Sequence, residues 1–271
     1  YGQVSKDIMR LQPPILGVAG DQQASLFGHC CFEKGQAKAT YGTGCFILMN
    51  TGAHAVPSKN GLVTTVAAST KGELRYALEG SVFNAGSTVQ WLRDELGLIK
   101  DASETEELAL SVPDTAGTYL VPAFTGLGAP WWDAEARGLI CGLTRGCTRA
   151  HLARAALESI AYQAYDVLEA MRNDFPCDIE ELAVDGGGSQ NRFTMGWQAG
   201  LLQRPVVRPK TAEVTALGAA YLAGLNAGYW KDLDSLRANA VQATRFKPEL
   251  AAKLRQQSLD GWYRALNRAR G

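Results

Sequence analysis

Short β-prone runs alternate with helical patterns along this chain of 271 residues. Two runs, Ala37 to Tyr41 and Cys45 to Asn50, flank the turn Gly42-Thr43-Gly44, which is rich in residues that tolerate positive φ, and predict a hairpin with an exposed tip. Further strands are predicted within GLVTTVAAS, GELRYALEG and GTYLVPAF. Because several of these strands are separated by short turns and others by helices, the sequence predicts an α/β fold with a mixed sheet.

Four stretches have the periodicity of helices. Ser87 to Leu96 and His151 to Met171 carry apolar residues on one face, so both are expected to lie against the sheet. The run from Val214 to Gly228 is rich in Ala and Gly, which favours close packing against a neighbouring backbone over direct contact with a ligand. A final amphipathic helix is predicted from about Glu249 to Arg268.

Composition argues against several functional classes. With 46% hydrophobic and 20% charged residues, the chain can bury a sizeable core. Lys plus Arg equal Asp plus Glu at 27 each, without a long run of either sign, so neither nucleic acid nor a membrane surface is an expected partner. No apolar stretch has the length of a membrane span and no signal-peptide pattern is present, so a cytoplasmic location is expected.

The cysteine and histidine pattern does not predict a metal site. The six cysteines include no C-x-x-C pair, and the three histidines are scattered without a metal-binding spacing. Free cysteine behaves as a small hydrophobic residue, so the six are expected to be buried structural thiols. No residue is therefore assigned as a metal ligand.

A second glycine turn, Asp185-Gly186-Gly187-Gly188, follows a predicted strand at Leu182 to Val184 and precedes a helix predicted from about Ser189. Backbone N–H groups without side chains at a helix N-terminus can bind phosphate, and the helix dipole adds partial positive charge. A tight strand-to-helix connection capped by Ser189 explains the same residues equally well. Neither a P-loop nor a Rossmann glycine pattern is present.

Several blocks together resemble the carboxy-terminal half of the FGGY family of carbohydrate kinases: AGDQQASLFG, TYGTGCFILMNTG, VPAFTGLGAPWWD, VDGGG and EVTALGAAYLAG. The resemblance implies an actin-like ATPase, or ribonuclease-H-like, fold with a mixed sheet flanked by helices and an active site between two domains. Residues 1–31 are then expected to end the amino-terminal domain, whose remainder is absent from this chain. Residues 32–271 are expected to form the carboxy-terminal nucleotide-binding domain.

Within that family, GDQQ, YGTGCF and GLGAPWWD resemble the members that phosphorylate glycerol more than those that act on pentuloses or gluconate. The resemblance implies ATP-dependent phosphorylation of glycerol to sn-glycerol 3-phosphate, with Mg²⁺ held mainly through water and nucleotide oxygens. A homo-oligomer is expected, and the chain alone, without the amino-terminal domain, is expected to be inactive. Another sugar or polyol kinase of the family and a non-catalytic actin-like nucleotide-binding protein are the alternatives.

Phosphoryl transfer to an alcohol needs a group that accepts the hydroxyl proton, and a carboxylate suits this role. The resemblance implies that Asp21 is this base and that Asp21 and Gln22 bind glycerol, although Asp21 considered alone is typical of a turn acid or helix cap. Phe46 matches an aromatic residue that packs on the carbon atoms of glycerol, although a Phe in a strand is more often core. Contacts with the nucleotide are implied in the same way for Thr43, Gly86, Gln90, Gly187 and Asn191.

Overall fold

A mixed sheet runs through the centre of the computed structural model, which describes residues 1–70, 72–239 and 243–271. Its strands are β1 (Ala37–Tyr41), β2 (Cys45–Gly52), β3 (Val63–Ala67), β4 (Arg75–Val82), β7 (Leu182–Asp185), β8 (Val206–Pro209) and β9 (Ala243–Phe246), in the order β3-β4-β2-β1-β7-β8-β9. β7 is parallel to β1 and β8, whereas the other neighbours are antiparallel. The predicted mixed sheet is therefore confirmed.

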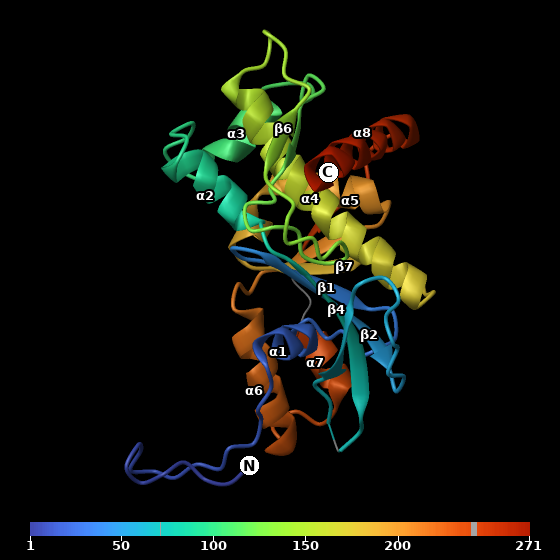
Figure 1. Ribbon diagram of the computed structural model, residues 1–271. Helices are drawn as coiled ribbons and strands as arrows, with labels where there is room; N and C mark the ends of the chain where they lie inside the picture. Colours follow the sequence, from blue (N-terminus) through green and yellow to red (C-terminus); the bar gives the residue numbers. More distant parts are fainter. Residues whose placement is uncertain (71, 240–242) are drawn as a thin grey trace.

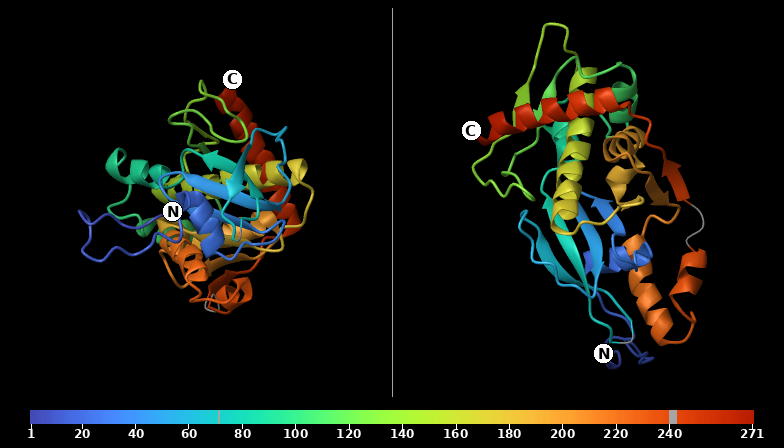
Figure 2. Two further views of the ribbon diagram at one scale, coloured as in Figure 1. Left: turned by 90° about the horizontal axis from the view of Figure 1, so that it is seen from below. Right: turned by 90° about the vertical axis from the view of Figure 1, so that its right-hand side faces the viewer.

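Helices cover both faces of this sheet (Figure 1). The helices of the described residues are α1 (Asp21–Gly28), α2 (Gly86–Asp94), α3 (Glu104–Leu110), α4 (Arg149–Asp174), α5 (Arg192–Leu202), α6 (Val214–Asn226), α7 (Leu233–Asn239) and α8 (Ala252–Arg270). In Figure 1, α4, α5 and α8 lie on one face, and α1, α6 and α7 lie on the other. A small second sheet, β5 (Tyr119–Val121) with β6 (Leu139–Cys141), packs beside α8, which crosses α4 in Figure 2.

The alternation of side chains along β1 assigns each residue to one face of the sheet. Ala39 and Tyr41 belong to the main hydrophobic core, which lies between the sheet and α4. Lys38 and Thr40 point to the opposite face, because successive residues of a strand face opposite sides. On that face Thr40 Oγ1 lies 3.3 Å from Ser25 Oγ of α1.

α6 and α1 pack with their backbones unusually close. A Cβ atom added to Gly218 of α6 would overlap the carbonyl group of Ala24 in α1, so only glycine permits this approach. Phe27, Tyr221 and Leu222 complete a small apolar cluster beside this contact. The prediction of tight packing for the Ala- and Gly-rich run is thus confirmed.

Two helix predictions need correction. α2 packs mainly on α4 instead of on the sheet, with Leu92 beside Ala153 and Ala156. The glycine turn continues into a 3₁₀ turn, η1 (Gly187–Gln190), and the following α-helix begins at Arg192, not near Ser189. The later start follows from the cap, since the Asn191 side chain accepts the free N–H at the third position of that helix.

Candidate active site

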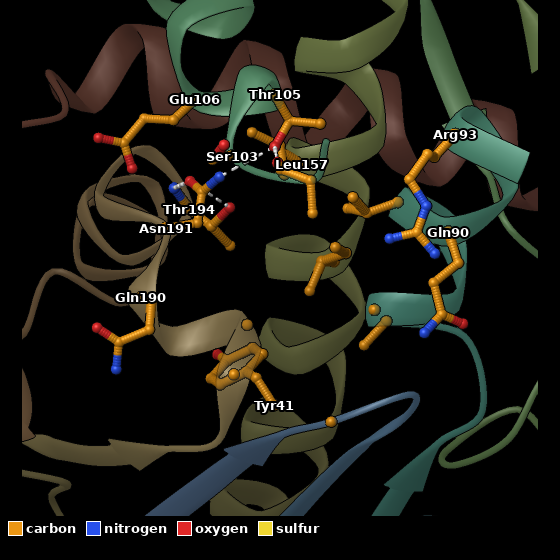
Figure 3. Close-up of a pocket in the computed structure, with 18 of the residues that line it drawn as sticks. Tyr41, Gln90, Arg93, Ser103, Thr105, Glu106, Leu157, Gln190, Asn191 and Thr194 are labelled. Atoms are coloured by element: carbon orange, nitrogen blue, oxygen red, sulfur yellow. Dashed lines mark hydrogen bonds between the residues drawn. The ribbon is translucent and has the colours of Figure 1, made fainter. Parts of the chain in front are cut away.

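A pocket of about 610 Å³ opens above the tip of the β1–β2 hairpin. In Figure 3, Gln90 and Arg93 of α2 face Gln190, Asn191 and Glu106 across the hollow. Five residues that the sequence predicts to contact a nucleotide line this pocket: Thr43, Gly86, Gln90, Gly187 and Asn191. The structure therefore brings together side chains and turns that lie far apart in the sequence.

The hairpin tip is held against the start of α2 by backbone hydrogen bonds. The N–H of Gly86 donates to the carbonyl of Gly42, and the N–H groups of Ala85 and Ser87 both donate to the carbonyl of Thr43, each across 3.0 Å. A Cβ atom on Gly86 would lie 2.5 Å from the Gly42 oxygen. Glycine at position 86 is therefore required by the close approach of two backbones, which position Thr43 at the pocket.

The glycines of the second turn differ in the space around them. Gly186 has a φ of 82°, and a Cβ atom there would lie 2.5 Å from the carbonyl oxygen of Tyr41. A Cβ atom on Gly188 would lie 3.0 Å from the Tyr41 Cβ. Around Gly187, in contrast, no protein atom lies within 4 Å of an added Cβ, and this residue lines the pocket. The protein's own packing explains the first two glycines, whereas Gly187 leaves room for a ligand to approach the backbone.

Asn191 has a structural role that the sequence did not reveal. Its Oδ1 accepts the backbone N–H of Thr194 at 2.9 Å, and its Nδ2 donates to Thr105 Oγ1 at 3.3 Å, as Figure 3 shows. Asn191 thereby caps α5 and fixes α3 beside it, and its contact with a nucleotide stays a prediction. The cap suggested for Ser189 is wrong, because its hydroxyl donates to the Gly186 carbonyl at 2.7 Å and closes the turn.

Asp21 and Gln22 lie at the start of α1, on the other face of the sheet, and are not part of the pocket wall. Asp21 is the first helical residue and is exposed, with Gly20 at the cap position. Its Oδ1 accepts the backbone N–H of Gln22 at 2.8 Å, while its Oδ2 lies 3.4 Å from the Gln22 Nε2. One carboxylate oxygen is thus committed to the helix start, and the other faces the amide of Gln22.

Phe46 is a surface residue of β2, although its neighbours Cys45 and Ile47 are fully buried. Its side chain is 36% exposed, so the interpretation as a core residue does not hold. Phe46 is paired with Thr40 of β1, and its carbonyl oxygen lies 3.5 Å from Lys38 Nζ. The same ammonium group donates to Oε1 of Gln22. The Gln22 side chain and the Phe46 carbonyl group therefore contact the same lysine.

A buried polar network connects Lys38 with the glycine turn. Lys38 Nζ donates to Thr40 Oγ1 at 2.8 Å, and Thr40 Oγ1 lies 3.3 Å from Ser25 Oγ. Ser25 donates to Asp185 Oδ2 at 2.8 Å, and His29 Nε2 lies 3.1 Å from the same oxygen. Burial by itself raises the pKa of Asp185, but hydrogen bonds from His29, Thr40 and Ser25 and the charge of His29 together hold that pKa below its ordinary value.

Several residues of this region were not identified from the sequence. Arg93 lies one helical turn after Gln90, and that spacing could have indicated a second side chain on the same face. Thr105 and Glu106 come from α3, whose sequence did not indicate a helix. The sequence shows Lys38 only as a single charge within the run AKATY, and this pattern does not indicate a functional role.

The remaining chemistry-bearing groups do not form another centre in the described ranges. No set of three or more His, Cys, Asp or Glu side chains there is arranged to hold a metal ion. All six cysteines are free thiols; Cys30, Cys31 and Cys45 are buried as predicted, whereas Cys141, Cys147 and Cys177 are partly exposed. In the same ranges no helix has the length and apolar character needed to cross a membrane.

The sheet, the helices on both its faces and the pocket at a hairpin tip define a domain of the actin-like ATPase fold, as predicted. Residues 37–227 match the family described as the FGGY family of carbohydrate kinases, C-terminal domain. The chain therefore belongs to the FGGY family of carbohydrate kinases.

Individual relatives are similar over nearly the whole of this chain. Glycerol kinase 1 of Clostridium tetani is 54% identical over 99% of it, and the glycerol kinase of Azotobacter vinelandii is 59% identical over 94%. These matches cover 54% and 51% of the two relatives, so the chain spans about half the length of the curated relatives it matches.

Among solved structures, Plasmodium falciparum glycerol kinase with ADP superposes with a TM-score of 0.90 at 38% identity, covering 96% of this chain and 52% of that one. Xylulose kinase from Rhodospirillum rubrum superposes with a TM-score of 0.82 at 26% identity, covering 98% of this chain and 55% of that one.

Proposed function

We propose that this chain is the carboxy-terminal half of an ATP-dependent glycerol kinase, which produces sn-glycerol 3-phosphate and ADP. One observation carries the proposal. Gln22 and Phe46, the expected glycerol contacts, both accept hydrogen bonds from Lys38 of β1. The tip of the same β1–β2 hairpin lines the pocket together with the other expected nucleotide contacts. The names of the similar proteins from Clostridium tetani and Azotobacter vinelandii support glycerol as the acceptor.

ATP fits the pocket by size and by the character of its walls. A volume of about 610 Å³ falls within the range typical of small-molecule sites. The open space at Gly187 would let a nucleotide touch the backbone, and Gln90 and Arg93 would offer donors from α2. Bound there, ATP supplies the phosphoryl group. Mg²⁺ is assigned to the phosphate oxygens and water, because this ion dehydrates reluctantly.

Asp21 is proposed as the general base. Its Oδ1 is held by the helix start, so Oδ2 would accept the proton of the attacking hydroxyl as the bond to phosphorus forms. Gln22 would bind a second hydroxyl, and the exposed ring of Phe46 would cover the apolar carbon atoms. Catalysis of this kind depends mainly on positioning and charge stabilisation.

We also propose a boundary between two domains within this chain. Residues 1–31 would end the amino-terminal domain, and residues 32–271 would form the nucleotide-binding domain. The segment before α1 extends away from the body in Figure 1 and leaves Ile8 and Leu11 79% and 78% exposed, which supports a separate origin for residues 1–20. α1 itself packs against α6 of the nucleotide-binding domain. A cytoplasmic location, a homo-oligomer and inactivity of the isolated chain are proposed on the sequence alone.

Product analysis tests the proposal. The complete gene product is incubated with ATP, Mg²⁺ and glycerol, xylulose or gluconate, and both ADP and the phosphorylated product are quantified. We expect ADP and sn-glycerol 3-phosphate in equal amounts and slow reaction with the other acceptors. A preference for xylulose or gluconate would favour another family kinase, and ADP binding without turnover would favour a non-catalytic protein. The chain of 271 residues alone should give no glycerol-dependent ADP.

A further inference from the structure

Lys38 is a charged residue in the interior of the protein. Its side chain is 0% exposed, and β1 is an inner strand between β2 and β7. Burial lowers the pKa of its ammonium group, and the nearby Asp185 carboxylate partly opposes that effect. Within the described ranges no carboxylate lies at ion-pair distance from it. A lysine in such a place is costly unless its hydrogens are satisfied in another way.

Three oxygen atoms satisfy the three hydrogens of this ammonium group. They belong to Gln22 of α1, Thr40 of β1 and Phe46 of β2, and the last two lie 2.8 and 3.5 Å from Nζ. An ammonium group donates three hydrogen bonds and accepts none. Lys38 therefore links α1, β1 and β2 through hydrogen bonds to one acceptor oxygen in each.

This arrangement determines which end of the Gln22 amide faces the substrate. Reversing the amide would place its NH₂ group against the ammonium, donor against donor, so Oε1 must face Lys38. The Nε2 atom then points the other way and lies 3.4 Å from Asp21 Oδ2. Gln22 thus presents only donors beside the proposed base.

We propose that Lys38 is a positioning residue that makes Gln22 an obligate hydrogen-bond donor to the acceptor substrate. This inference rests on the proposed function. One hydroxyl of the substrate gives its proton to Asp21, while a neighbouring hydroxyl oxygen accepts an N–H from Gln22. The pair therefore selects polyols with adjacent hydroxyl groups, although Lys38 itself touches no substrate.

A double-mutant cycle in the complete gene product tests this role. Lys38→Met removes the ammonium while keeping much of the volume, and Gln22→Ala removes the amide. Each is expected to raise KM for glycerol about 10- to 100-fold, as for loss of a charge-assisted hydrogen bond, and to change KM for ATP less than about twofold. The double variant should be no worse than Gln22→Ala. Lys253→Met, an exposed lysine of α8, is the matched control and should behave as wild type.

Other results would contradict the positioning role of Lys38. Multiplying effects in the double variant, or an equal rise of both KM values for Lys38→Met, would show that Lys38 only stabilises the fold. If Lys38→Met does not fold, Gln22→Glu decides, because its carboxylate keeps a partner for the ammonium but offers no donor. We expect a folded protein with at least about tenfold weaker use of glycerol, and a KM near wild type would overturn the inference. Wild-type protein without glycerol-dependent ADP release would overturn the proposed function first.

Discussion

The backbone N–H of Gly86 donates to the carbonyl of Gly42 across 3.0 Å, and this contact joins the start of α2 to the tip of the β1–β2 hairpin. Gly86→Ala would place a Cβ atom 2.5 Å from that carbonyl oxygen, which belongs to backbone and cannot yield easily. We expect a lower melting temperature and at least about tenfold weaker ADP binding, a change of about 1.4 kcal/mol. Differential scanning fluorimetry and calorimetric titration measure the two effects.

The control is Gly196→Ala in α5, where an added Cβ meets no atom within 4 Å. This substitution should be neutral or stabilise the helix by up to about 1 kcal/mol. If both alanine variants bind ADP equally well and melt alike, the hairpin contact does not position the pocket.

Gly187→Ala separates binding from folding. An added Cβ finds no protein atom within 4 Å, so the melting temperature should stay near wild type, while the methyl group would occupy space proposed for the nucleotide. We expect ADP to bind about tenfold more weakly. Gly186→Ala provides the contrast, since its φ of 82° and its contact with Tyr41 should lower stability. Unchanged ADP affinity in Gly187→Ala would place the nucleotide elsewhere.

Asp166 of α4 should make stability depend on pH. Burial raises the pKa of its carboxyl to about 7, although N–H groups of Trp262 and Trp131, 2.9 and 3.3 Å away, oppose the rise. Between about pH 4 and 7 the folded protein then holds a proton that the unfolded chain releases. Stability should therefore fall as pH rises through this window, by at most about 1.4 kcal/mol per pH unit from this group.

Asp166→Asn removes this titration and keeps an oxygen acceptor for the two tryptophans. Urea unfolding of both proteins at pH 5 and pH 7 should show a smaller loss of stability in the variant. The remaining slope is expected from Glu158, whose pKa burial also raises to about 7. Parallel pH profiles for wild type and variant would show that Asp166 does not titrate in this range.

Phe46→Ala tests the aromatic contact with the acceptor. Because Phe46 is 36% exposed, we expect little loss of stability, but a rise in KM for glycerol several times that for ATP. Phe27→Ala, at a residue that is 3% exposed, should instead lower the free energy of unfolding by about 3 to 5 kcal/mol. Equal rises of both KM values in Phe46→Ala would mean that the residue supports the domain and not the substrate.

The elements that local patterns define could be predicted from the sequence. The β1–β2 hairpin follows from strand-forming runs around Gly42-Thr43-Gly44, and α4 follows from apolar periodicity sustained over many turns. α3 could not be predicted, because its seven residues, rich in glutamate, are stabilised as a helix by packing against α4 and α5. Such short helices depend on tertiary contacts more than on propensity.

The site could be predicted only as separate pieces. Nothing near Lys38 in the sequence shows that Gln22, sixteen residues earlier, supplies its acceptor. The capping role of Asn191 likewise required the true start of α5, and its bond to Thr105 joins residues 86 positions apart. Contacts of this kind are products of the fold, and single-sequence patterns do not encode them.

The most direct test of Asp21 as the general base is the turnover of Asp21→Asn in the complete gene product, measured by coupled ADP release with saturating glycerol, ATP and Mg²⁺. Asparagine keeps the shape of the side chain and its contact with the Gln22 N–H, but it cannot take a proton. We predict a kcat lower by about 10²- to 10⁴-fold, as for loss of a general base, with glycerol and ADP affinities within a few-fold of wild type. A kcat within about tenfold of wild type would contradict the assignment of Asp21 as the base of phosphoryl transfer.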